Sequence, residues 1–66
     1  KELYGLTERE MEVLSLIVEG LTNSQIAENL TITTYTAKAH VHSVLQKLSA
    51  GTRAKATQKA ITEGLV

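Results

Sequence analysis

The 66 residues make a single domain, and a chain this short leaves much of its surface exposed, so a deep enzyme pocket is not expected. The absence of cysteine excludes disulfides and thiolate metal sites, and an aromatic share of 3% means that aliphatic residues and alanine must build the core. The net charge is zero, yet residues 1–33 carry six acids against two bases and residues 34–66 carry five bases against one acid. This dipolar pattern can present one basic face to phosphate groups.

The first predicted helix covers about residues 8–19. Thr7 and Glu10 have the spacing of a capping box, in which each side chain bonds the backbone N–H of the other residue. An apolar stripe follows, and Gly20 can adopt the left-handed conformation that often ends a helix. Its apolar positions are Val13, Leu14, Leu16 and Ile17.

The second and third predicted helices cover about residues 23–30 and 34–48. Thr22 and Thr33 are placed to cap their first turns. The short helix, the tight link and the longer helix have the spacing of a helix-turn-helix over residues 23–48. The apolar positions are Ile26, Ala27 and Leu30 in the second helix, and Ala37, Val41, Val44, Leu45 and Leu48 in the third.

The fourth predicted helix covers about residues 53–63, after a break at the sequence SAG, with Thr52 as its cap and Gly64 at its end. Its apolar positions are Ala54, Ala56, Ala60 and Ile61. The fold class predicted for residues 1–66 is therefore all-α, a compact four-helix domain that contains a helix-turn-helix.

The outward face of the helix at 34–48 is the candidate functional surface. With the apolar positions inward, it presents Tyr35, Lys38, Ala39, His42 and Gln46. A helix fits the major groove of duplex DNA. We expect this face to enter that groove.

Four segments resemble the LuxR/FixJ/NarL-type effector domain of bacterial response regulators and quorum sensors. They are LTEREMEVL, GLTNSQIAENL, TAKAHVHSVLQKL and the closing helix from Arg53 to Leu65, in the same order and spacing. The resemblance implies DNA base contacts by Lys38, Ala39 and His42. It implies phosphate contacts by Ser24, Thr34, Thr36 and Lys47, and we expect Tyr35 to join them. The link SAG lacks the basic or polar residues that some relatives have there.

The resemblance also implies an assembly larger than this chain. Members usually bind DNA as dimers through the fourth helix, which here offers Ala56, Ala60 and Ile61. A receiver or ligand-binding domain is expected to precede the domain, with residues 1–6 as a remnant of the linker. The chain would then be the output domain of a phosphorelay response regulator, acting on DNA in the bacterial cytoplasm.

A protein-docking module is the alternative. The acidic first half or the alanine-rich last helix would then contact a receiver domain, RNA polymerase or a sigma factor, and the neutral net charge favours this reading. A metal site is not expected, because His40 and His42 are two residues apart and point about 200° from one another on a helix. We expect no cofactor and no enzymatic activity.

Overall fold

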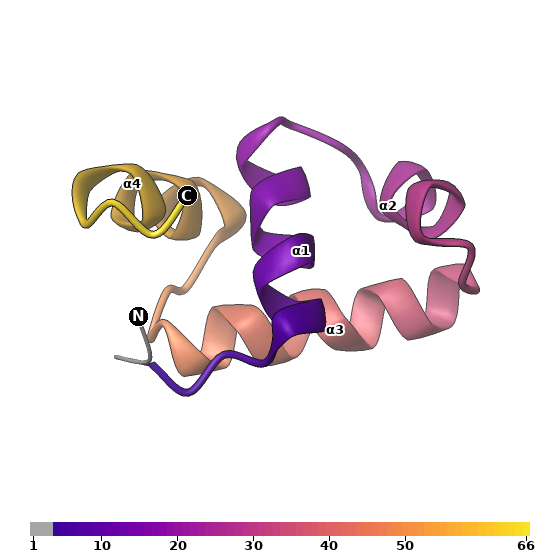
Figure 1. Cartoon of the computed structure of the whole chain (residues 1–66), viewed down its shortest axis with the longest axis horizontal. Helices are drawn as coiled ribbons and strands as arrows, with labels where there is room; N and C mark the ends of the chain where they lie inside the picture. Colours follow the sequence, from indigo (N-terminus) through magenta and orange to yellow (C-terminus); the bar gives the residue numbers. More distant parts are fainter. Residues whose placement is uncertain (1–3) are drawn as a thin grey trace.

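The computed structural model describes residues 4–66, which form four helices around one apolar core (Figure 1). α1 spans Glu8–Val18, α2 spans Asn23–Leu30, α3 spans Thr34–Lys47 and α4 spans Arg53–Thr62. No strand occurs within residues 4–66. The predicted all-α class and the order of the helices are confirmed. α2 has the predicted bounds, and the other three helices end one residue earlier than the sequence predicts.

Each helix begins after a threonine whose side-chain oxygen accepts a hydrogen bond from the backbone N–H three residues later. These threonines are Thr7, Thr22, Thr33 and Thr52. In α1 the Glu10 carboxylate returns a bond by accepting from the Thr7 backbone N–H at 2.9 Å, and Gln25 does the same for α2. The predicted capping box of α1 is confirmed, and α2 has a second one. Both satisfy backbone donors that a helix start otherwise leaves unpaired.

The ends of α2 and α3 differ from the glycine-terminated end of α1. Gly20 has a φ of +91°, as predicted, but Thr31 and Ser49 also adopt left-handed conformations, with φ of 58° and 54°. After Thr31, the Ile32 N–H donates to the Ala27 carbonyl oxygen at 2.9 Å, which closes the turn between α2 and α3. Non-glycine residues in this conformation are strained, and the sequence analysis did not predict them.

α1 stands at the centre of the fold and packs against the other three helices, with α3 lying across one end (Figure 1). Most predicted apolar positions are buried, but Leu16, Leu30 and Leu45 are only partly buried, and Ala54 and Ile61 are exposed. The buried apolar side chains are Leu6, Val13, Leu14, Ile17, Ile26, Ala27, Ala37, Val41, Val44, Leu48, Ala56 and Ala60. This core holds one face of α3 inward and therefore fixes which face is open.

The segment before α1 is part of the domain. Residues 1–6 were expected to be a linker remnant, of which residues 1–3 lie outside the described part of the chain. Leu6 is buried in the core, and the Tyr4 hydroxyl donates to the carboxylate of Glu63 beyond the end of α4. Residues 4–6 are therefore packed rather than free. No helix in residues 4–66 has the length and apolar character needed to span a bilayer.

Candidate nucleic-acid interface

The outer face of α3 has the composition that the sequence predicts. Tyr35, Lys38, Ala39 and His42 are all exposed, Tyr35 to 83%, and together they line an open hollow of about 390 Å³. The structure therefore brings the three predicted base-contact residues and Tyr35 onto one surface. This surface faces away from the core, because the opposite side of α3, with Ala37, Val41 and Val44, is buried against α1 and α2.

Lys38 supplies the positive charge of this surface. It takes part in neither of the two ion pairs found within residues 4–66, which join Arg9 to Glu12 and Lys47 to Glu10. An exposed ammonium without a carboxylate partner retains all three donors for a ligand. Lys38 can therefore donate to an acceptor brought to the outer face of α3.

Three of the predicted phosphate-contact residues lie in the first turns of α2 and α3. Ser24 is exposed in the first turn of α2, and Thr34 is the exposed first residue of α3. Thr36 is partly buried, and its hydroxyl oxygen accepts a hydrogen bond from the Thr33 hydroxyl at 2.9 Å. Helix starts present backbone N–H groups and a positive dipole end, which suit an anion.

Lys47 has a structural role that the sequence analysis missed. Its ammonium lies 2.7 Å from the Glu10 carboxylate and donates to the Gly5 carbonyl oxygen at 3.0 Å. The Ser43 hydroxyl also donates to Glu10, at 2.6 Å. A phosphate contact by Lys47 would have to compete with this intramolecular pair.

The same contacts shift the ionisation of Glu10. The Lys47 ammonium, then the Ser43 hydroxyl and the Thr7 backbone N–H, lower the pKa of Glu10 from 4.5 to about 2, although burial acts in the opposite direction. Each of these donors favours the charged carboxylate. Glu10 is thus an anion that joins α1 to α3, in addition to its predicted role as a capping residue.

Two further bases of the positive half make intramolecular contacts. The Arg53 guanidinium donates to the Asn23 side-chain oxygen at 2.9 Å and to the Leu21 carbonyl, and so connects the start of α4 to the start of α2. Lys59 donates to the Leu48 carbonyl oxygen at 2.9 Å and so closes the end of α3. Within residues 34–66, the bases outside these contacts and the Glu10 pair are Lys38 and Lys55.

The predicted dimerisation surface of α4 needs correction. Ala56 and Ala60 are 0% exposed and belong to the core of the monomer, so these side chains cannot contact a partner helix without opening the fold. Ile61 is 61% exposed and remains available. The small side chains of Ala56 and Ala60 allow α4 to pack closely against the rest of the same chain.

The two histidines occupy different environments, as the helical geometry predicts. His40 is partly buried, whereas His42 is exposed on the outer face of α3. Within residues 4–66, no three histidine or acidic side chains lie close enough together to hold a metal ion.

A two-turn helix, a three-residue link and a longer helix with an open outer face define a helix-turn-helix domain. Residues 4–60 match the family described as "Bacterial regulatory proteins, luxR family". The chain belongs to this family and is a helix-turn-helix DNA-binding domain of it, as its resemblance implied. The family consists of regulators, not enzymes, in agreement with the expectation from the sequence.

Known relatives place this domain within longer proteins. The chain is 46% identical over 62 residues to the transcriptional regulatory protein LiaR of Bacillus subtilis (strain 168), covering 94% of this chain and 29% of LiaR. It is 46% identical over 66 residues to the response regulator protein VraR of Staphylococcus aureus (strain Mu3), covering 98% and 32%. The crystal structure of the response regulator ChrA, of a heme-sensing two-component system, superposes with a TM-score of 0.87 at 34% identity, covering 94% and 31%. The chain thus spans about a third or less of the length of these proteins.

Proposed function

We propose that this domain binds duplex DNA in a sequence-dependent manner, with α3 in the major groove, as the output domain of a response regulator. The observation that supports this most directly is the outer face of α3, where an unpaired lysine, an alanine and a histidine share one open surface. The major groove is wide enough for a helix and displays a different pattern of donors, acceptors and methyl groups for each base pair.

The three side chains suit three kinds of base contact. The Lys38 ammonium can donate to guanine O6 or N7, and the Ala39 methyl group can pack against the C5-methyl group of thymine. His42 lies one helical turn beyond Lys38 and can hydrogen-bond the next base edge. Together they would read two or three neighbouring base pairs per monomer.

Phosphate contacts would hold α3 in register. We assign them to Ser24, Thr34, Tyr35 and Thr36, which lie in the first turns of α2 and α3 and offer hydroxyl groups. Lys47 is also proposed to contact phosphate, but it is the weakest member of this set because its ammonium already pairs with Glu10.

The complete protein would bind as a dimer and carry a receiver or sensor domain. The further domain is supported by the small share of LiaR and VraR that this chain covers and by the identity of VraR as a response regulator protein. Within this domain, the exposed Ile61 is the remaining candidate for a contact between two α4 helices. Such a protein would work in a bacterial cytoplasm as part of a two-component phosphorelay.

Selection of bound sites from a random duplex pool tests this function. We expect an enriched consensus, and we expect Lys38→Ala to weaken binding to it by ~1–3 kcal/mol and to relax the preference at one base pair. Arg9→Ala is the control, because Arg9 pairs with Glu12 on α1 and lies outside the proposed interface. Failure to enrich any sequence, or equal losses from the two variants, would contradict the proposal.

A protein-docking function is the second candidate. Glu8 and Glu12 are exposed in α1, and Glu19 is exposed at its C-cap. Their spacings of four and seven residues place them along one side of the helix. This acidic side suits a basic protein surface and repels DNA. The two functions use different faces and can coexist. If the domain only docks to a protein, adding DNA should not change the NMR chemical shifts of the outer face of α3.

A further inference from the structure

We propose that Ser49 and Lys55, beside the turn between α3 and α4, extend the DNA-binding surface beyond the recognition helix by binding one phosphate of the same duplex. This inference rests on the proposed function, because α3 must bring the duplex to the turn. It assigns a role to Lys55, the basic residue of α4 whose side chain makes no hydrogen bond within residues 4–66, unlike Arg53 and Lys59. It also adds a contact to the DNA backbone beside the link SAG between α3 and α4.

The argument begins with three adjoining hollows on the surface. The first is lined by Tyr35, Lys38, Ala39 and His42. The second shares His42 and is also lined by Leu45, Gln46, Ser49, Ala50 and Gly51. The third shares Ser49 and Ala50 and extends along α4, where Lys55 also lines it. Because neighbouring hollows share residues, the surface is continuous from Lys38 to Lys55.

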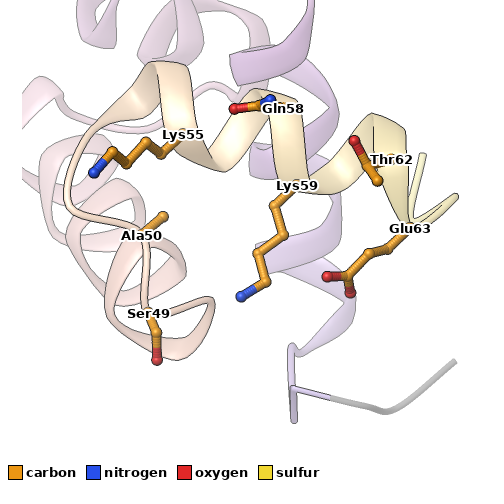
Figure 2. A pocket seen from close by; sticks show the side chains of 7 residues that line it. All are labelled: Ser49, Ala50, Lys55, Gln58, Lys59, Thr62 and Glu63. Atoms are coloured by element: carbon orange, nitrogen blue, oxygen red, sulfur yellow. The ribbon is translucent and has the colours of Figure 1, made fainter.

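The third hollow is positive at the end nearest the turn. Figure 2 shows Lys55 and Glu63 at opposite ends of this hollow, with Lys59 between them. Lys59 already donates to the Leu48 carbonyl oxygen, and Glu63 accepts from the Tyr4 hydroxyl. The charge left for a ligand at the end nearest the second hollow is therefore the Lys55 ammonium.

A phosphate suits the donors that line this part of the hollow. Ser49 and Lys55 are both exposed, and a hydroxyl and an ammonium are common donors to the oxygens of a DNA phosphate. A second copy that docked through this same surface is a poorer occupant, because it would bring positive charge to a positive surface. Continuity with the outer face of α3 and complementary charge both favour the backbone of the duplex that α3 reads.

The first test compares Lys55→Gln with the unchanged protein on the selected site and on a scrambled duplex, over a range of salt concentrations. We expect binding to both duplexes to weaken by a similar factor, about 2- to 10-fold, and the slope of log K against log salt to fall by about 0.9, as for the loss of one phosphate contact. Arg9→Gln is the matched control, since it removes the same charge from an exposed position on α1 and should leave the slope unchanged. Lys38→Ala should instead weaken binding to the selected site more than binding to the scrambled duplex.

The second test neutralises single phosphates in the selected duplex by methylphosphonate substitution. Substitution at one position should weaken DNA binding by the unchanged protein but not weaken binding by Lys55→Gln any further. The phosphate at that position is then the partner of Lys55. An unchanged salt slope for Lys55→Gln, while the unchanged protein binds its site normally, would overturn this inference alone. Reduced self-association of Lys55→Gln in sedimentation, with DNA binding unaffected, would overturn it in favour of a second copy. Failure of the unchanged protein to prefer any duplex would overturn the proposed function as well.

Discussion

Glu10 Oε1 and Lys47 Nζ lie 2.7 Å apart and join the first turn of α1 to the last residue of α3. The Glu10 side chain is 9% exposed and the Lys47 side chain 35%, so the carboxylate is largely shielded from solvent and the lysine is partly open to it. Ser43 and the Thr7 backbone N–H satisfy the rest of the carboxylate. This cluster holds α1 across α3 and keeps the opposite face of α3 turned toward solvent.

Removing the charge of Glu10 should destabilise the fold. Glu10→Gln leaves Lys47 without its counter-ion and weakens the bond from Ser43, and we expect the free energy of unfolding to fall by about 1–3 kcal/mol in urea titrations. Glu12→Gln is the matched control, because Glu12 forms an exposed pair with Arg9 at 3.4 Å and should contribute at most about 0.5 kcal/mol. Equal effects of the two substitutions would show that the Glu10 pair does not hold the helices together.

The lowered pKa of Glu10 predicts a specific loss of stability in acid. Since the folded-state pKa of about 2 lies below the ordinary value of 4.5, its contribution is fully present above about pH 4.5 and is lost as the pH falls toward 2. We expect this part to amount to about 1–2 kcal/mol, after allowance for solvent screening at Lys47. Unfolding free energies measured from pH 6 to 2.5 should therefore fall more steeply for the unchanged protein than for Glu10→Gln, and parallel curves would contradict the assignment.

Thr31 offers a stabilising substitution. Its φ of 58° is unfavourable for a β-branched residue, so Thr31→Gly should raise the stability by about 0.5–1 kcal/mol in spite of the greater flexibility of glycine in the unfolded chain. Thr33→Ala, two residues later, removes the cap of α3 and should lower the stability by about 1 kcal/mol. Thermal unfolding of both variants checks this, and a destabilised Thr31→Gly would mean that the threonine side chain has a role beyond the turn.

Substitutions at two adjacent positions of α4 should affect the stability differently. Ala60→Leu inserts a larger side chain into the filled core and should cost about 1–3 kcal/mol or more. Ile61→Glu alters an exposed position and should leave the stability within about 0.5 kcal/mol. If α4 also joins two copies on DNA, only Ile61→Glu should weaken the dimer while the monomer stays folded. Denaturation and sedimentation with the selected duplex separate these outcomes, and a well-tolerated Ala60→Leu would argue against the buried position.

Local patterns predicted much of this molecule. The four helix starts follow from threonines placed before apolar segments, and the open face of α3 follows from the inward positions of Ala37 and Val41. The role of Lys47 could not be predicted in this way, because its partner Glu10 is 37 positions away. The burial of Ala56 could not be predicted either, because the sequence does not show which face of α4 packs against α1. Ala56 was therefore assigned to a dimer contact.

NMR chemical shifts measured with and without a short duplex test whether the outer face of α3 meets the DNA. We predict that the largest perturbations on adding the selected duplex fall within residues 34–47, at Tyr35, Lys38, Ala39 and His42 above all, with the acidic side of α1 unaffected. Perturbations confined to α1 or α4, with the outer face of α3 unchanged at saturating DNA, would contradict the account.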